Sequence, residues 1–286
     1  MESSKKLKAI LKVNLNAGDF DWLEQKLDHI KKEKSSKDLF LNYSILGSRI
    51  PDTPLNQLHM EDKGLQGYLE LQGANKRQMA RIFLLVDVLV ADPSFFAPKV
   101  NNIIQVADTS ELVTFLKFLT LLPDAGSFKT TAVDTLRTNI STVFDAITLN
   151  NPYPSRYFNG QQWNQMYLKA AFMQRDLSKI VDIDKRANAD LARIISDYAH
   201  ERWAASRDID PYFWRPVTQF LEGQLLLDME RLLQSNNASE RKAGALCCYH
   251  SKNEKGQKLL KKYPDLLRQV ESKKISWENI KDNLVS

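Results

Sequence analysis

The sequence predicts an all-α protein, and two observations carry this prediction. Glycine and proline number only 10 each among 286 residues, too few for the many turns of a sheet protein. Apolar residues recur along the chain at the three, four and seven spacing of a helix face. Hydrophobic residues make up 43% and charged residues 26%, as in folded globular proteins. We therefore expect an irregular right-handed array of antiparallel helix pairs with HEAT- or ARM-like packing.

Residues 1–74 are expected to form N-terminal helices and a long loop. Asp19 and Asp38 are each placed to cap a helix that continues with an apolar face. Residues 51–74 contain prolines and glycines with little periodicity, which is typical of a loop. The rest of the chain, 75–286, is expected to form a second helical domain that is continuous with the first part.

The strongest helical pattern follows residue 75. Between Met79 and Val90 apolar residues occupy more than one stripe, as in a helix packed on several sides. Asp92 followed by Pro93 is typical of a helix start. A helix over 128–149 is predicted from the apolar stripe formed by Val133, Leu136, Ile140, Val143, Phe144 and Ile147.

Two further helices are predicted over 161–173 and 188–206, and a helix pair near the end of the chain. The buried stripe of the helix over 188–206 is expected to contain Leu191, Ile194, Ile195 and Tyr198. From Ser239 the sequence resembles one HEAT repeat, with small residues in its first helix and a proline after its second. Cys247 and Cys248 are neighbours on that first helix, so we expect two buried reduced thiols and no disulfide.

The net charge of +5 comes from the two ends of the chain. Residues 1–37 contain nine lysines against six acids, and 252–286 contain nine basic residues against five acids. These lysines are interpreted as solvated helix faces, so no nucleic-acid partner is expected, although peripheral contact with an anionic membrane stays open. The longest apolar run, 82–91, contains Asp87 and is too short to span a bilayer. Since no signal peptide is recognised either, a cytoplasmic location is expected.

Motifs for common cofactors are missing from the sequence. No phosphate-binding loop, dinucleotide fingerprint or nucleophile elbow is present, so no cofactor is expected. His200 and Glu201 begin a zinc-peptidase pattern, but position 204 is alanine where a second histidine is required. Asp197 and His200 have the spacing of two metal ligands, yet no second such pair occurs, so no metal site is expected.

Polar residues gather on one side of three predicted helices. The polar face of the predicted helix over 128–149 has two possible interpretations: it is exposed to solvent, or it lines a pocket between helices. On 188–206 a structural cluster and a catalytic cluster both remain open, with Asp197, His200 and Glu201 as candidate acid/base groups. Lys169, on the predicted helix over 161–173, also has two interpretations. Its side chain extends from a buried helix to solvent, or its amine forms a Schiff base with a substrate.

Four blocks of sequence resemble a known family. They are RTNISTVFDAI from Arg137, NPYPSRYF from Asn151, WNQMYLKAAF from Trp163, and DIDKRANADLARIISDYAHERWAASR from Asp182. Together they resemble the EboA domain family of bacterial proteins encoded with the ebo gene cluster. The resemblance implies a link to production or export of a secondary metabolite, because the cluster also encodes prenyltransferase-like, dehydroquinate-synthase-like, hydrolase-like and isomerase-like proteins. It implies other ebo-cluster proteins or a small-molecule pathway intermediate as partners, and it transfers no catalytic role.

The polar signature of the family supplies the candidate ligand-binding residues. These are Arg137, Asn139, Asn151, Tyr153, Tyr157, Asn164, Lys169, Asp184, Arg186 and Arg202. The signature also contains Tyr198 and the three candidate acid/base residues Asp197, His200 and Glu201. Asp182 stands where the family commonly has glycine, and Ile183 stands for leucine. We expect a changed turn there, which weakens the case for Asp184 as an anchor.

Two functions follow from these observations. The first is a binding or scaffold module that presents a polar groove to a pathway enzyme or to its prenylated product. The second is a pathway enzyme that uses the polar cluster for acid/base chemistry on an anionic or prenylated substrate. For either function we expect six side chains to converge across a helix interface: Arg137, Asn164, Lys169, Asp197, His200 and Glu201.

Overall fold

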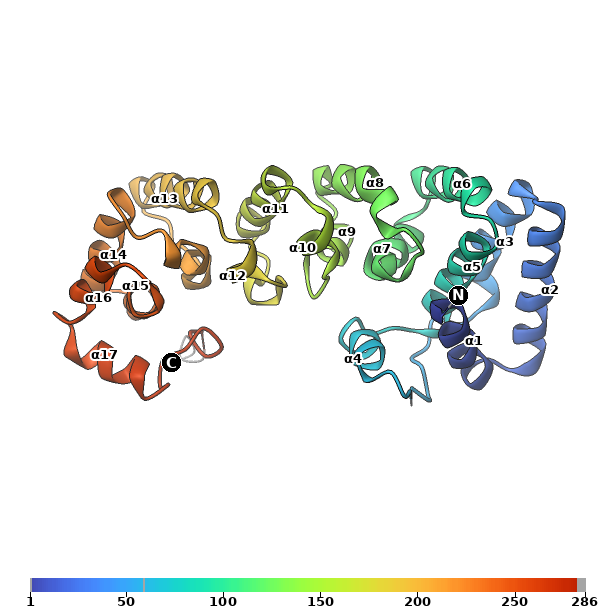
Figure 1. The fold of residues 1–286 in the computed structure, drawn as a ribbon, viewed down its shortest axis with the longest axis horizontal. Coiled ribbons are helices and arrows are strands. Elements are labelled where there is room, and N and C mark those ends of the chain that lie inside the picture. The colour runs from blue at the N-terminus through green and yellow to red at the C-terminus, as the bar shows by residue number, and fades with distance from the viewer. Residues whose placement is uncertain (1, 59, 282–286) are drawn as a thin grey trace. The chain divides into compact units, whose positions relative to one another are not determined.

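The computed structural model describes residues 2–58 and 60–281. Over these residues the chain forms α-helices and short 3-10 helices without a β-strand, and one isolated bridge joins Pro54 to Asn75. The all-α prediction is therefore confirmed, whereas the right-handed HEAT- or ARM-like packing stays a prediction. The chain divides into two compact units, Met1–Tyr157 and Phe158–Ser286 (Figure 1). The proposed domain boundary after residue 74 likewise stays a prediction.

The first unit consists of ten α-helices and three 3-10 helices within its described residues. The α-helices are α1 (Glu2–Asn14), α2 (Ala17–Glu33), α3 (Ser36–Arg49), α4 (Lys63–Leu71), α5 (Lys76–Ala91), α6 (Pro93–Gln105), α7 (Thr109–Phe118), α8 (Lys129–Asp134), α9 (Ser141–Thr148) and α10 (Tyr153–Tyr157). The 3-10 helices are η1 (Leu119–Leu121), η2 (Ala125–Phe128) and η3 (Thr135–Arg137).

Helix α5 is the centre of the first unit, as its apolar pattern predicts. It contacts α1, α2, α3, α6 and α7 (Figure 1), and its residues from Met79 to Val86 are all buried. Asn75 caps the helix in a reciprocal capping box with Gln78. Asp92 caps α6 with Pro93 at the first helical position, so the expected helix start is confirmed.

Three local predictions in this unit are wrong. Asn16 and Ser35 cap α2 and α3, so Asp19 and Asp38 lie in the first turn and are not the caps. The expected loop over 51–74 contains α4, which Asp62 caps. Glycines in α4 interrupt its apolar periodicity, so the sequence pattern did not predict this helix. The Tyr68 hydroxyl of α4 donates a hydrogen bond to the Lys117 carbonyl of α7.

The predicted helix over 128–149 is broken. The chain runs through α8 and η3, leaves helical geometry at Thr138, and enters α9 at Ser141. The Thr138 hydroxyl accepts from the Ile140 amide at 3.1 Å, a local bond that competes with the helix. The break turns Ile140 outward to 51% exposure and leaves Val133 half-buried. Leu136, Val143, Phe144 and Ile147 are buried as expected.

The second unit contains seven α-helices and two 3-10 helices among its described residues. The α-helices are α11 (Gly160–Phe172), α12 (Ile183–Arg186), α13 (Ala189–Ala204), α14 (Gln224–Gln234), α15 (Ala238–His250), α16 (Glu254–Leu260) and α17 (Pro264–Glu271). The 3-10 helices are η4 (Leu177–Lys179) and η5 (Pro211–Gln219). In α13 Leu191 and Ile195 are buried, whereas Ile194 and Tyr198 are half-buried.

Helix α15 is the core of the second unit. It contacts η5, α14, α16 and α17, and its small residues allow these close approaches. A side chain at Gly244 would place a Cβ 3.0 Å from the Leu232 Cβ and 3.3 Å from the Leu233 amide nitrogen. Cys247 and Cys248 are both buried, which confirms their expected burial.

None of the helices within residues 2–58 and 60–281 is long and apolar enough to cross a membrane.

Candidate functional site

His200 belongs to a hydrogen-bonded cluster between α13 and α14. Its Nε2 lies 2.7 Å from Oδ1 of Asp228, a carboxylate that is only 1% exposed. Asp228 also accepts from the Ser196 hydroxyl at 2.5 Å and from the Gln224 amide at 3.0 Å. Ser196, His200 and Gln224 all hydrogen-bond to the buried Asp228 carboxylate. The cluster is therefore a satisfied polar network that links α13 to α14.

The other two candidate acid/base residues have a different setting. Asp197 accepts from Arg193 at 3.0 Å on the exposed side of α13, and Glu201 is exposed one turn further along. Across the described part of the chain, no group of three or more His, Cys, Asp and Glu side chains is arranged to hold a metal ion.

Asn164 and Arg186 hold the start of α13 in place. Asn164 exchanges two hydrogen bonds with Asn188, at 3.2 and 2.9 Å, and Asn188 caps α13. Arg186 donates to the Phe158 carbonyl at 2.8 Å, and its guanidinium lies 4.9 Å from the centre of the Trp163 ring. Burial lowers the pKa of Arg186. Lys169 is half-buried on α11.

Residues 151–157 of the NPYPSRYF segment form a packed corner in the first unit. Asn151 donates to the carbonyls of Leu116 and Ala146, at 2.9 and 2.8 Å, and accepts from the Tyr153 amide. The Tyr153 hydroxyl donates to the Ala125 carbonyl at 2.8 Å, and burial raises its pKa.

The Tyr157 ring lies tilted by 36° against the Tyr153 ring, with ring centres 4.5 Å apart, and it packs beside Gly126. Arg137 and Asn139, at the break after η3, are exposed. Because Arg137 belongs to the first unit, its convergence with Asn164, Lys169, Asp197, His200 and Glu201 of the second unit stays a prediction.

Asp184 forms a bidentate ion pair with Arg215. Its carboxylate accepts from Arg215 Nε at 2.8 Å and Nη2 at 2.6 Å. Burial alone would lower the pKa of Arg215, but the bonds with Asp184 raise it above its ordinary value. The preceding Asp182 has φ 61°, the left-handed conformation that glycine enters most easily. Asp184 thus anchors η5 despite the substitution before it.

Arg202 and Tyr198 line a cavity of about 500 Å³ in the second unit, here called the arginine cavity. Arg175 and Arg207 line it as well, together with the ring of Phe213. Arg202 donates to the Asp208 carbonyl through Nε at 3.1 Å and Nη2 at 2.5 Å, which closes the turn after α13. Tyr198 packs edge-on against Phe213, with ring centres 5.2 Å apart. The walls therefore combine cationic and aromatic groups.

The arginine cavity has an excess of positive charge. Its three arginines face two aspartates, Asp208 and Asp210. Asp210 already accepts an ion pair from Lys281 at 2.7 Å and caps η5. Since guanidinium groups stay charged and bind carboxylate or phosphate oxygens in pairs, such a cavity suits an anion that also has an apolar part.

Sequence reasoning missed several residues of these clusters. Arg202 and Tyr198 belong to the predicted signature, but Arg175 and Arg207 lie in turns without periodicity. Asp228 could have been found, because it occupies the buried stripe of α14 together with Met229 and Leu232. A carboxylate on an apolar stripe requires hydrogen-bond donors nearby.

Comparison with known proteins identifies the family. The family model described as "Metabolite traffic protein EboA" matches residues 3–218. The chain belongs to the EboA family. Comparisons with curated proteins and with solved structures gave no match.

The range matched by the EboA family includes the N-terminal helices and ends within η5. Every residue lining the arginine cavity, from Ala171 to Phe213, lies inside the matched range. The Asp228 cluster is completed by α14, which follows that range.

Proposed function

We propose that this EboA protein binds a small anionic metabolite in the arginine cavity and thereby takes part in metabolite traffic. The supporting observation is the cavity itself, in which three arginines and two aromatic rings meet inside the family-matched part of the chain. A volume of about 500 Å³ suits a ligand of metabolite size. The ligand class is an organic phosphate, diphosphate or carboxylate with an apolar portion.

The geometry assigns different roles to the arginines. Arg202 is engaged with the Asp208 carbonyl, so it holds the turn and presents its remaining donors. Arg207 is exposed on the same turn and supplies charge to the mouth of the cavity. The half-buried Tyr198 ring, which packs against the buried Phe213 ring, offers apolar surface to the rest of the ligand. This division of roles supports binding and release without a covalent step.

Calorimetry with inorganic pyrophosphate and with citrate tests the anion subsite. Arg207→Gln should weaken binding of both probes about tenfold, because a charge-assisted contact is lost. The matched control is Arg193→Gln on the exposed side of α13, where Arg193 pairs with Asp197 outside the cavity. Equal binding by the two variants, or no binding by the unaltered protein, would contradict the proposal.

A further inference from the structure

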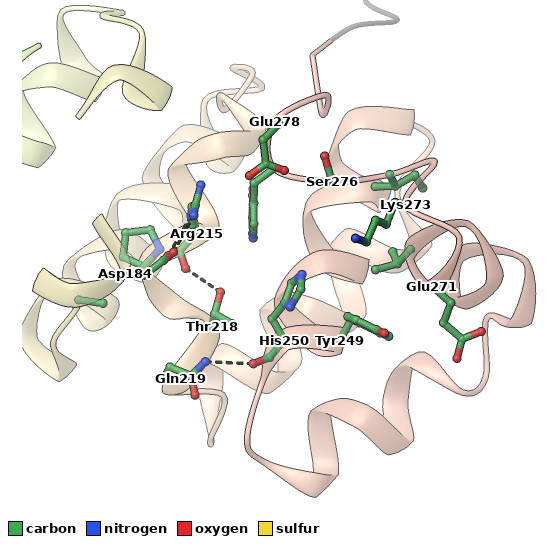
Figure 2. Close-up of a pocket in the computed structure, with 15 residues that line it drawn as sticks. Asp184, Arg215, Thr218, Gln219, Tyr249, His250, Glu271, Lys273, Ser276 and Glu278 are labelled. Carbon is green, nitrogen blue, oxygen red and sulfur yellow. Dashed lines mark hydrogen bonds and ion pairs between the residues drawn. The ribbon is translucent and has the colours of Figure 1, made fainter. Parts of the chain in front are cut away.

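A second cavity of about 600 Å³ lies in the second unit, between η5, the end of α15 and the segment that follows α17 (Figure 2). It is here called the tail cavity. One of its walls comes from residues 249–278, which follow the family-matched range. A ligand bound there would therefore belong to a function beyond the one proposed above.

Several polar groups of the tail cavity are already satisfied by protein partners. Arg215 and Asp184 neutralise each other through their paired hydrogen bonds. The Thr218 hydroxyl donates to the Arg215 carbonyl at 2.6 Å, and the Gln219 amide donates to the His250 carbonyl at 3.0 Å (Figure 2). These contacts fix one wall of the tail cavity, and they leave these groups with few free donors or acceptors for a ligand.

Two charged groups remain available to a ligand. In the described part of the chain the Lys273 amine has neither a hydrogen bond nor an ion pair, and Figure 2 shows it directed toward the His250 ring. Glu278 also lines the cavity, and a hydrogen bond from Ser276 lowers the pKa of its carboxyl group, which favours the charged form. The Glu271 carboxylate points away from the cavity.

The cavity therefore offers one cation and one anion beside an apolar surface. Tyr249, Val270, Ile275 and Trp277 supply that surface. Trp277 is held in place by the Tyr212 ring, 5.6 Å away, and by the Arg215 guanidinium, 5.8 Å from its centre. A polyanion would meet repulsion from Glu278, whereas a zwitterion matches both charges.

We propose that the tail cavity binds a zwitterionic ligand of the amino-acid type with an aromatic side chain. Its carboxylate binds the Lys273 amine, with His250 as a second donor, and its ammonium group binds Glu278. Its side chain packs among Tyr249, Val270 and Trp277. Each charged contact contributes separately, so removing either charge from the ligand should weaken binding.

Calorimetry with three probes tests this assignment. L-tryptophan carries both charges, tryptamine lacks the carboxylate, and indole-3-propionate lacks the amine. The unaltered protein should bind L-tryptophan about tenfold or more tightly than either analogue, as expected for loss of one charge-assisted contact. Lys273→Met should weaken binding of L-tryptophan and indole-3-propionate but should not weaken binding of tryptamine, since it removes a like charge. Glu278→Gln should weaken binding of L-tryptophan and tryptamine but should not weaken binding of indole-3-propionate, for the same reason.

Matched controls come from the same segment. Lys274→Met removes an exposed lysine next to Lys273 that does not line the cavity, and Glu271→Gln removes the carboxylate that points away. Both controls should bind L-tryptophan like the unaltered protein. The assignment is overturned if the unaltered protein does not bind L-tryptophan or if each variant changes all three probes equally. Pyrophosphate binding in the arginine cavity is independent of either result.

Discussion

Replacing Asp228 by alanine should destabilise the second unit by about 2–4 kcal/mol. Asp228 is 1% exposed and is the common acceptor for Ser196, His200 and Gln224. Ser196 is buried, so its hydroxyl would lose its partner without gaining water, at a cost of about 1–3 kcal/mol. His200 and Gln224 reach solvent, and each would contribute less.

Urea unfolding followed by tryptophan fluorescence measures this effect in the second unit. Trp163, Trp203, Trp214 and Trp277 lie in that unit, whereas Trp22 lies in the first. With a urea dependence of about 2–3 kcal/mol per molar, the unfolding midpoint should fall by roughly 1 M.

Two variants on α13 sharpen the test. Asp197→Ala removes an exposed carboxylate and should change the unfolding free energy by under about 0.5 kcal/mol. Ser196→Ala combined with Asp228→Ala should cost less than the sum of the single changes, because both act on one hydrogen bond. Equal effects of Asp228→Ala and Asp197→Ala would refute the structural role of the cluster.

Three further predictions concern other residues. Arg81→Ala leaves Glu111 buried without its cation, so the free energy of unfolding of the first unit should fall by about 3–5 kcal/mol; thermal unfolding by circular dichroism would contradict this with an unchanged Tm. Hydrogen bonds from Lys34 and the Phe95 amide lower the pKa of Asp92 to about 2, so its stabilisation should be present above about pH 4 and lost toward pH 2. Asp92→Asn should then flatten the loss of Tm over that range, and an identical slope would argue against the ion pair. Burial raises the pKa of Cys248 to about 12 and raises that of Cys247 as well, so iodoacetamide at pH 8 should modify neither thiol until urea is added; rapid labelling of the folded protein would show exposed thiols.

Local sequence signals predicted the helices well where capping and periodicity agree. Helix α5 has a capping box at Asn75 and apolar residues on several sides, so both its start and its burial could be predicted. Around Thr138 the apolar spacing continues on both sides of the break, and only a side-chain hydrogen bond marks it. Apolar periodicity alone does not predict such a hydrogen bond. Helix α4 was missed because its glycines interrupt the apolar pattern, and the hydrogen bond that links it to α7 joins residues distant in sequence.

The arginine cavity could be predicted only in part for the same reason. Arg202 and Tyr198 belong to a recognisable block on α13, and they do share a cavity. Arg175 and Arg207 join them because two turns with left-handed residues, Gln174 and Ser206, bring them to the same place. No spacing rule on one helix relates these turns to each other.

The most direct test of metabolite binding is to identify what the protein retains from its native cells. The unaltered protein, Arg207→Gln and Arg193→Gln would be purified in parallel, denatured, and their released small molecules compared by mass spectrometry. We expect an organic anion in stoichiometric amount with the unaltered protein and with Arg193→Gln, and its loss from Arg207→Gln. An unaltered protein that releases no organic anion, or equal release from all three proteins, would contradict binding in the arginine cavity.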